Sequence, residues 1–331
     1  MKTGLFVTLE WDADPDDGRH IANMLEQVKT ARDAGFSSLW VPQHFVVGPK
    51  KRQLATSPVL GLLAGIAPDM SLGTGVMLLP MLNPVLLAEE AATIDHLTDG
   101  KFTLGVGLGY RDPEFQVFGV ERASRVPRFR EYIEVIRRLW TEDRVTFHGK
   151  YIHLDDVGLS LRPKNPNGIP IWVGSAVDDG VKRAAEIGDS WVNAGSMSRD
   201  DLRRWWGLFH ETRIARGKSL DYPRQVAREC FCGPDMKTAT ALAMGPIAAK
   251  YQHYAGFGWS DFDPSQGAAA LNAFAQDRFV VGDETFVRDE LQRYRDEFGA
   301  TEFRFRMAWP GLPQSEVIAS IRRVGQIVAS L

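Results

Sequence analysis

Short apolar runs alternate with longer amphipathic stretches along all 331 residues of the chain. Such runs are typical of buried strands, and the longer stretches are typical of helices with one apolar face, so the pattern predicts successive β-α units. The expected strands are 5–9, 38–41, 71–78, 102–106, 171–173, 190–193, 226–231 and 302–307. The expected helices are about 19–34, 58–67, 84–98, 126–140, 178–187, 199–216, 286–298 and 315–330.

Residues that favour helix ends stand at several of these boundaries. Asp16 and Asp17 precede the first helix as N-caps, Gly35 follows it, and Pro84 takes the first position of the third helix. The repeated β-α units predict a closed (β/α)8 TIM barrel of the α/β class, with a doubly wound open sheet as the alternative. In such a barrel the reactive chemistry lies at the C-terminal ends of the strands.

Two segments interrupt this alternation. Residues 145–154 read VTFHGKYIHL, which predicts a hairpin before the fifth strand with its turn near His148 and Gly149. Residues 237–278 form an insertion before the seventh barrel helix, rich in Ala, Gly and aromatic residues. Because a structureless loop of that length is unusual, we expect a helical excursion over the barrel mouth. Residues 1–331 are expected to form one domain, because no linker or repeat divides them.

Composition excludes several classes of protein. Hydrophobic residues make up 44% and charged residues 24%, as in a soluble globule with a sizeable core. The net charge of −3 and the lack of a long basic run argue against nucleic acid or an anionic membrane as a partner. No apolar stretch reaches the roughly 20 residues that cross a bilayer. The N-terminus lacks the features of a signal peptide, so a cytoplasmic location is expected.

Motifs for metals and for several common enzyme classes are absent from the sequence. Cys230 and Cys232 are the only cysteines, which excludes a disulfide framework, and no second ligand pair accompanies them. The chain has no G-x-x-x-x-G-K-[ST], H-E-x-x-H or G-x-S-x-G motif. The acidic run 12–18 departs from a calcium-binding loop at its glycine and at its twelfth position, Asn23. We therefore expect no metal site.

A glycine cluster, GVGLG at 105–109, begins at the end of the fourth expected strand. A dinucleotide fingerprint needs its third glycine one residue further on and a helix directly after it. Here Tyr110 begins a segment, 110–113, that is expected to be a turn. Gly107 and Gly109 either relieve crowding at the barrel rim or let a flat ligand approach the backbone, and we favour the ligand.

A second group of residues has the chemistry of a phosphate site. Gly174 and Ser175 follow the fifth expected strand and precede a helix, whose free N–H groups attract anions. Ser175 is otherwise a simple helix cap. Arg125 and Arg128 are three residues apart and could aim at one anion from a helix face, or each could be a surface charge.

The remaining candidates stand at other strand ends. His44 follows the second strand, where it could act as a general base, bind a cofactor or be structural. Several large or apolar side chains near strand ends predict an apolar, aromatic mouth suited to a planar ring and an apolar substrate. These residues are Trp11, Met77, Leu79, Trp309 and Pro310.

Many short motifs occur in an order that resembles the bacterial luciferase-like flavin monooxygenases. In the first half of the chain they are TGVMLLP at 74–80, NP at 83–84, AEE at 88–90, IDHL at 94–97, GKF at 100–102, GVGLGY at 105–110, EF at 114–115 and FGV at 118–120. Further along they are PIWVG at 170–174, AA at 184–185, GD at 188–189 and Trp191. The resemblance covers most of residues 1–195 and the last fifty residues, and leaves the insertion unmatched.

The resemblance implies a TIM barrel that binds FMN, or the deazaflavin F420, at its C-terminal rim. It also implies a non-proline cis peptide between Gly75 and Val76 that faces the flavin ring. Several other residues occupy matching positions and are implied to contact the cofactor. They are Gly107, Gly109 and Tyr110 beside the ring, Gly174 and Ser175 at the phosphate, and Arg125 and Arg128 as the family's Arg-x-x-Arg.

Two positions depart from the family's pattern. Leu108 stands where luciferases carry an arginine, which shifts the neutralisation of phosphate to Arg125 or Arg128. The family's Glu-His-His segment is Pro42, Gln43 and His44 here, so only the second histidine is kept.

The function implied is a two-component flavin-dependent monooxygenase. Reduced FMN (FMNH2) would come from a separate NAD(P)H:flavin reductase and react with O2 to a C4a-hydroperoxide, which would oxygenate a small apolar substrate. His44 would hydrogen-bond or deprotonate near that adduct, and Tyr110 would shape the substrate pocket. An F420-dependent hydride-transferring enzyme and a non-catalytic flavin-binding protein are the alternatives. A homodimer that pairs through the apolar face of residues 84–97 is also implied.

Overall fold

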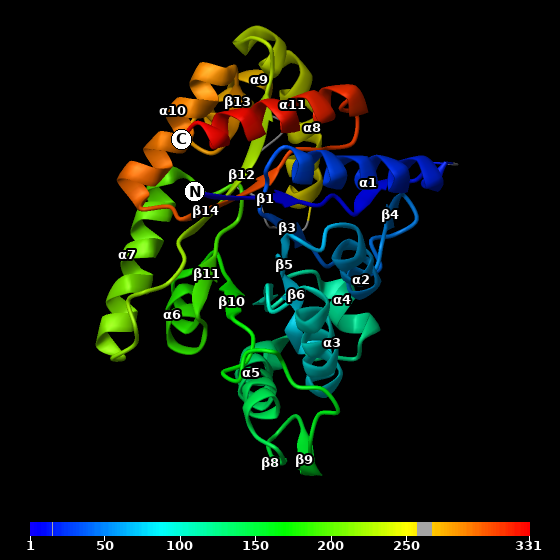
Figure 1. The fold of residues 1–331 in the computed structure, drawn as a ribbon, viewed down its shortest axis with the longest axis vertical. Coiled ribbons are helices and arrows are strands. Elements are labelled where there is room, and N and C mark those ends of the chain that lie inside the picture. Colours follow the sequence, from blue (N-terminus) through cyan, green and yellow to red (C-terminus); the bar gives the residue numbers. More distant parts are fainter. Residues whose placement is uncertain (15, 257–266) are drawn as a thin grey trace.

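The computed structural model describes residues 1–14, 16–256 and 267–331. A ten-stranded parallel sheet forms its centre, in the order β11-β10-β7-β5-β3-β1-β14-β12-β13, and β6 also pairs with β7. The strands are β1 (Lys2–Phe6), β3 (Ser38–Val41), β5 (Ser71–Thr74), β6 (Met77–Leu78), β7 (Phe102–Gly107), β10 (Ile171–Gly174), β11 (Ser190–Val192), β12 (Gln225–Cys232), β13 (Val280–Gly282) and β14 (Glu302–Arg306). The sheet curls, and its helices lie around it (Figure 1).

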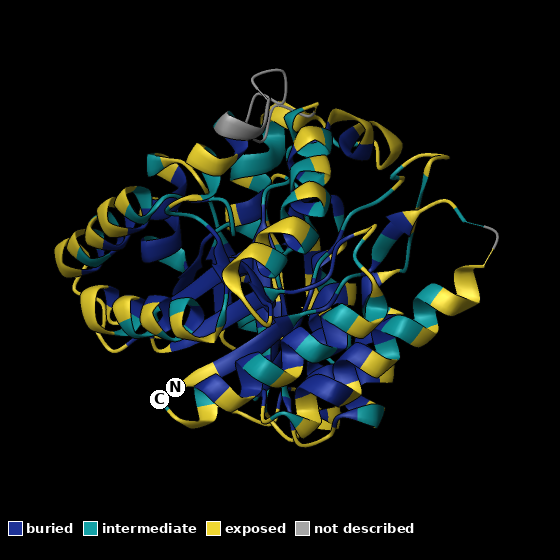
Figure 2. Ribbon diagram, turned by 90° about the horizontal axis from the view of Figure 1, so that it is seen from above, coloured by how far each residue is buried: buried dark blue, intermediate teal, exposed yellow. Residues whose placement is uncertain are grey.

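The helices that connect these strands have their apolar faces against the sheet. Figure 2 shows buried strands at the centre and exposed outward faces on the surrounding helices. These helices are α1 (Asp17–Asp33), α2 (Thr56–Ile66), α3 (Pro84–Leu97), α5 (Arg125–Thr141), α6 (Asp178–Ile187), α7 (Arg199–Ala215), α10 (Glu284–Phe298) and α11 (Gln314–Ala329). In the described part of the chain, no helix is long and apolar enough to span a bilayer.

The curled sheet has a seam between β11 and β12. Among the described residues no backbone ladder joins these two strands. The Asn193 side chain joins them instead, since its Oδ1 accepts from the Ala227 N–H at 2.9 Å and from Gln225 Nε2 at 2.9 Å. The expected fully closed barrel is therefore corrected at this point, because β11 is only three residues long and a side-chain amide takes over the pairing.

Several further elements lie outside the repeating β-α units. They are β2 (Glu10–Asp12), β4 (Lys51–Gln53), η1 (Leu79–Met81), α4 (Asp112–Val117), η2 (Arg122–Ser124), α8 (Met236–Ala255) and α9 (Gly267–Ala275), while β8 (Val145–His148) and β9 (His153–Val157) pair as an antiparallel hairpin beside α5. Part of the expected insertion, residues 257–266, lies outside the described residues.

The expected turn at 110–113 is wrong in its second half, because α4 begins at Asp112. Pro113 in the first turn and the acidic side chains of Asp112 and Glu114 favour a helix N-terminus there. The helix starts three residues after Gly109, so the segment still lacks the direct strand-to-helix step of a dinucleotide fingerprint.

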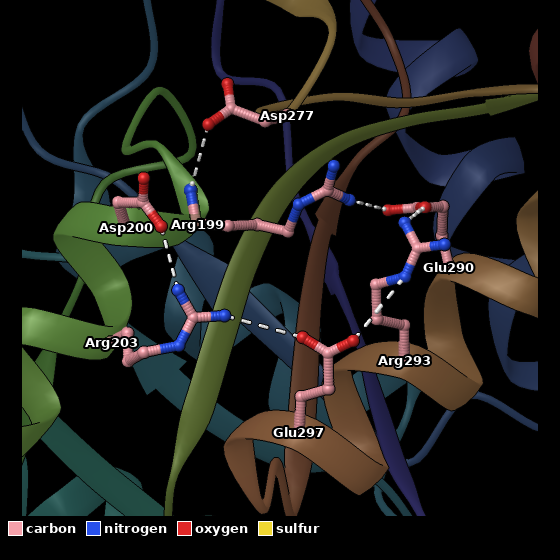
Figure 3. Close-up of polar contacts among 7 residues, drawn as sticks. All are labelled: Arg199, Asp200, Arg203, Asp277, Glu290, Arg293 and Glu297. Atoms are coloured by element: carbon pink, nitrogen blue, oxygen red, sulfur yellow. Dashed lines mark hydrogen bonds and ion pairs between the residues drawn. The ribbon is translucent and has the colours of Figure 1, made fainter.

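An ion-pair network joins α7 to α10 (Figure 3). Arg199 Nη1 lies 2.7 Å from Glu290, and Arg203 bridges Asp200 at 2.8 Å and Glu297 at 3.4 Å. Arg293 contacts both Glu290 and Glu297, and the Arg199 N–H donates to Asp277 at 3.3 Å. The network therefore fixes the segment after α9, next to the cavity described below.

Candidate functional site

A cavity of about 820 Å³ opens at the C-terminal ends of the strands. Its walls come from the segments after β1, β3, β5, β7, β10, β11 and β14, and from α8. The predicted residues His44, Gly75, Val76, Gly107, Gly109, Tyr110, Arg125, Gly174, Ser175, Trp309 and Pro310 all line it. Residues from distant parts of the sequence thus meet in one site.

Val76 forms a ledge in this cavity, next to two glycines. The Gly75–Val76 peptide bond is cis, as the resemblance implied. A Cβ at Gly107 would lie 2.6 Å from Val76 Cγ2, and one at Gly174 would lie 3.0 Å from Val76 Cγ1. These glycines therefore make room for the valine side chain. Gly109 is required for a different reason, since its φ of +76° is a conformation that glycine adopts most easily.

Basic side chains gather at one end of the cavity, beside Ser175. A Cβ at Gly180 would lie 1.8 Å from Ser175 Oγ and 3.2 Å from Arg183 Nη2, so the missing side chain lets these two groups meet. The Arg183 side chain is buried, and its Nε has no hydrogen-bond partner among the described residues. Burial lowers the pKa of Arg183, and the positive charges of Arg130 and Arg125 lower it further. This end of the cavity has the donors and the charge to hold an anion.

Ser175 does not cap α6, because the N-cap residue is Val177 and has no capping side chain. Its hydroxyl instead lies 3.3 Å from both the N–H and the carbonyl oxygen of Val177. The hydroxyl thus faces the cavity from the turn that leads into the helix.

His44 is held by a buried carboxylate. Glu114 Oε1 lies 3.0 Å from His44 Nδ1 and accepts from the Phe45 N–H at 2.9 Å. Arg111 Nη1 lies 3.7 Å from the same oxygen. Because a carboxylate accepts, Nδ1 carries the proton of the neutral ring, and Nε2 is left as an acceptor. The pair can therefore hold or move a proton at Nε2.

Tyr110 stands edge-on to this histidine, with ring centroids 5.8 Å apart. Burial raises the pKa of the Tyr110 phenol far above its usual value. The phenol therefore stays protonated at neutral pH and can serve as a hydrogen-bond donor in the cavity.

An arginine lies directly beneath the Gly75–Val76 segment. Arg304 is buried, its guanidinium stacks on Trp40 at 4.8 Å, and its Nε donates to Gln225 at 2.6 Å. Its Nη1 has no hydrogen-bond partner within residues 1–14, 16–256 and 267–331, and it would lie 2.7 Å from a Cβ at Gly75. Burial lowers the pKa of Arg304 to about 10, so it is still charged at neutral pH.

A buried ion pair forms the wall opposite Ser175. Lys250 of α8 contacts Glu229 Oε1, which also accepts from the Tyr251 hydroxyl at 2.9 Å. Trp309 Nε1 donates to Glu229 Oε2 at 2.7 Å. Burial alone would raise the pKa of Glu229, but the charges of Lys250 and Arg306 and these hydrogen bonds hold it below its usual value. Burial lowers the pKa of Lys250 to about 8 despite the carboxylate.

Four predicted site residues do not reach the cavity. Met77 and Leu79 point into the main hydrophobic core, and Trp11 stacks on His20 with ring centroids 5.3 Å apart. Arg128 donates to the Tyr132 hydroxyl at 2.7 Å and lies over the Tyr151 ring. Successive side chains after β5 point either into the cavity or into the core, and the apolar pattern of the sequence does not show which of them face the cavity. The cavity mouth, predicted to be apolar and aromatic, is also lined by the charged side chains of Glu229 and Lys250.

Sequence reasoning missed Arg183, the pairing of Glu114 with His44, and the Glu229–Lys250 pair. Arg183 lies on an amphipathic helix, where an arginine normally faces solvent. Glu114 is 70 residues from His44, and Lys250 is 21 residues from Glu229, so no local spacing indicates either contact. The one sequence feature that could have indicated a site role for Glu114 is its place in the EF motif at 114–115.

The two cysteines of β12 are buried and reduced. Burial raises the pKa of the Cys230 thiol well above its usual value, and that of Cys232 to about 11. Within residues 1–14, 16–256 and 267–331, no group of three or more His, Cys, Asp or Glu side chains could hold a metal ion.

Comparison with known families decides the affiliation. The pattern of the luciferase-like monooxygenases matches residues 1–302. The chain belongs to this family. This luciferase-like chain is 32% identical over 227 residues to 4-hydroxyprotoasukamycin monooxygenase of Streptomyces nodosus subsp. asukaensis, covering 66% of the chain and 60% of the relative. It is 34% identical over 177 residues to F420-dependent glucose-6-phosphate dehydrogenase of Kineococcus radiotolerans, covering 51% of each. The matches thus span only about half to three fifths of these relatives.

Solved structures share the fold over the full length. Monooxygenase RslO1 from Streptomyces bottropensis has a TM-score of 0.84 at 19% identity and covers 100% of this luciferase-like chain and 99% of its own. The oxygenating constituent of 3,6-diketocamphane monooxygenase from Pseudomonas putida, solved with FMN, has a TM-score of 0.78 at 19% identity, with coverage of 100% and 98%. The curled parallel sheet is therefore that of the luciferase-like TIM barrels.

Proposed function

We propose that this luciferase-like chain is a flavin-dependent oxidoreductase, a monooxygenase that uses reduced FMN and O2. Reduced FMN, delivered by a separate NAD(P)H:flavin reductase, supplies the two electrons with which one oxygen atom enters a small organic substrate and the other leaves as water. The names of the monooxygenase relative and of the FMN-bound neighbour support this proposal.

The observation that carries the proposal is the buried guanidinium of Arg183 at one end of the cavity. In the part of the chain that the structure describes, the buried Nε of Arg183 beside Ser175 lacks a hydrogen-bond partner, and Arg125 adds positive charge. A phosphate would satisfy these donors. From that end the cavity extends over the Val76 ledge, with Gly107, Gly109, Tyr110 and Gly174 along it, so the residues present fit a phosphorylated flat cofactor.

The protein's own residues have separate tasks in this proposal. Arg183, Ser175 and Arg125 bind and orient the cofactor, while His44 holds or moves a proton at Nε2 under the control of Glu114. Tyr110 donates a hydrogen bond from a phenol that stays neutral. The buried wall around Glu229 excludes water from the reaction space.

An F420-dependent hydride transfer is the second candidate, and the F420-dependent relative at 34% identity favours it. It would use the same cavity but would not consume O2. A flavin-binding protein without activity is the third candidate.

A cofactor titration followed by oxygen uptake separates the three. The monooxygenase proposal expects tight binding of FMNH2 and oxygen consumption beyond that of free FMNH2. Tight binding of F420 with no oxygen uptake would favour the dehydrogenase. Flavin binding with uptake equal to that of free flavin would leave only a binder.

We also propose a homodimer through α3. Leu86 and Leu97 on α3 are 56% and 53% exposed, and Leu62 on α2 is 42% exposed. These side chains are exposed on two helices that contact each other in the fold, and burial of exposed apolar surface favours association.

A further inference from the structure

The cavity has more positive charge than one cofactor phosphate needs. Among the described residues, nine Lys and Arg side chains and four Asp and Glu side chains line its walls. The basic residues at the Ser175 end are accounted for by the proposed cofactor. The others lie on β4, β12, α8 and β14 and in the segment after α9, and most already have acidic partners or hydrogen bonds.

Arg306 is different because, among the described residues, its charge acts on the carboxylate of Glu229 only from beyond ion-pair distance. It stands at the end of β14, half-buried, and its guanidinium lies over the Phe6 ring at 4.4 Å. With the described residues it makes no hydrogen bond and no ion pair. Arg304, two residues earlier, points to the same side of the strand, so both guanidinium groups face the interior of the curled sheet.

The nearest acidic groups are already occupied. Both oxygens of Glu229 are used, one by Lys250 and Tyr251 and the other by Trp309. Glu10 lies 3.9 Å from Lys51, which contacts Asp12 at 2.6 Å. A guanidinium in a partly dry cavity needs an acceptor, and its planar donors fit two carboxylate oxygens.

The position of Arg306 separates it from the proposed phosphate site. In the sheet order, β14 is separated from β10 by β1, β3, β5 and β7 in one direction and by β12 and β11 in the other. Ser175 follows β10, so the two basic sites stand on opposite sides of the cavity mouth. One cofactor phosphate cannot serve both.

We propose that Arg306 binds a carboxylate of the substrate, and that the substrate is a small organic acid rather than an uncharged apolar compound. The apolar part of such an acid would lie against Phe6 and the aromatic wall of Tyr251 and Trp309, which line the same cavity. The inference rests on the proposed function in one respect, that the bound acid is the substrate of the reaction. Binding of the acid itself can be measured without turnover.

Calorimetric titration of the protein with organic acids and their amides tests the proposal. The probes are benzoate, 3-phenylpropanoate and octanoate, each beside its amide, so that only the charge differs within a pair. We expect at least one acid to bind roughly ten- to one-hundred-fold more tightly than its amide, the range for charge-assisted hydrogen bonds. Arg306→Met should abolish this preference, and Arg306→Lys should keep part of it. Equal binding of acid and amide, or binding of neither, would overturn the proposal.

Lys51→Met is the matched control. It removes one positive charge from the same cavity, but from a lysine that already contacts Asp12, so the preference for the acid should persist. Loss of the preference in both variants would assign it to the overall field of the cavity and overturn the role of Arg306.

FMN titration of the same variants separates this inference from the proposed function. Arg306→Met should keep its affinity for FMN. If that affinity falls as far as the affinity for the acid, Arg306 serves the cofactor and the inference fails. If the wild-type protein binds no flavin but still prefers the acid, the proposed function fails and the anion site stands.

Discussion

Glu229→Gln is expected to destabilise the protein in a way that depends on pH. The substitution keeps the size of the side chain and one acceptor for Tyr251 or Trp309, but it leaves the Lys250 ammonium buried without its counter-charge. Breaking a buried ion pair from one side typically costs about 3–5 kcal/mol of unfolding free energy. The cost here has a ceiling, because the lysine can lose its proton.

That ceiling follows from the ordinary pKa of lysine. Deprotonating a group of pKa about 10.4 costs about 4.6 kcal/mol at pH 7 and about 1.9 kcal/mol at pH 9. Burial lowers the pKa of Lys250 to about 8 while Glu229 is in place, and Glu229→Gln lowers this pKa further because it removes the carboxylate that raises it. The destabilisation is therefore fully present below that lower pKa and is relieved as pH rises towards the unfolded value. We expect Glu229→Gln to cost about 3 kcal/mol at pH 7 and less than about 2 kcal/mol at pH 9.

Urea unfolding at both pH values checks this. Replacing both residues, as Glu229→Gln with Lys250→Met, should be more stable than Glu229→Gln alone, because no unpaired charge is left. Arg144→Met removes the partner of Asp156 from an exposed pair and should change the stability little. A cost for Glu229→Gln that is equal at the two pH values, or a double variant no more stable than Glu229→Gln, would refute the reasoning.

Four further expectations follow from the site and the surface. Ser175→Asp should weaken FMN binding far more than riboflavin binding, because a carboxylate opposes the phosphate where hydrogen bonds to charge contribute about 1.5–3 kcal/mol each; equal loss for both ligands would place the phosphate elsewhere. Arg183→Met should weaken FMN at least ten-fold in fluorescence titrations, whereas Arg128→Met, whose guanidinium contacts Tyr132, should not. His44→Ala should leave FMN affinity nearly unchanged and slow product formation by roughly 10²–10⁴-fold; a lowered melting point with normal turnover would give the histidine a structural role only. Sedimentation should show a dimer at micromolar concentration, and a single 36.9 kDa species would contradict the apolar face of α3 as an interface.

The fold was predictable to a large extent because each element carries its own local signal. The expected strand 38–41 and helix 178–187 coincide with β3 and α6. The seam could not be predicted, because it depends on the Asn193 side chain reaching a strand that begins 32 residues later. The expected strand 71–78 is divided into β5 and β6, and the cis bond between Gly75 and Val76 lies between them; the family resemblance implied that bond and the apolar pattern did not.

The candidate site was predictable where residues directly follow strands, as His44 and Ser175 do. It was not predictable where a side chain reaches the cavity from a helix or an insertion. In the sequence, Arg183 and Lys250 cannot be told apart from the charged residues that face solvent on a helix. Only the tertiary packing shows that both side chains line the cavity. The prediction that Met77 and Leu79 line the cavity differs from the structure for another reason. Side chains along an extended segment alternate between its two faces, so a shift of one residue decides whether a side chain faces the cavity or the core.

The contact of Val76 with Gly107 and Gly174 has a consequence for how these positions evolve. With two methyl groups 2.6 and 3.0 Å from the places where the glycines would carry a Cβ, a side chain at either glycine position requires a smaller residue at position 76. Among homologous sequences the sizes of the three residues should therefore be anticorrelated. An alanine at position 107 would be tolerated after a valine-to-alanine or valine-to-glycine change at 76 and purged before it, so the order of substitutions along a lineage is constrained by this contact.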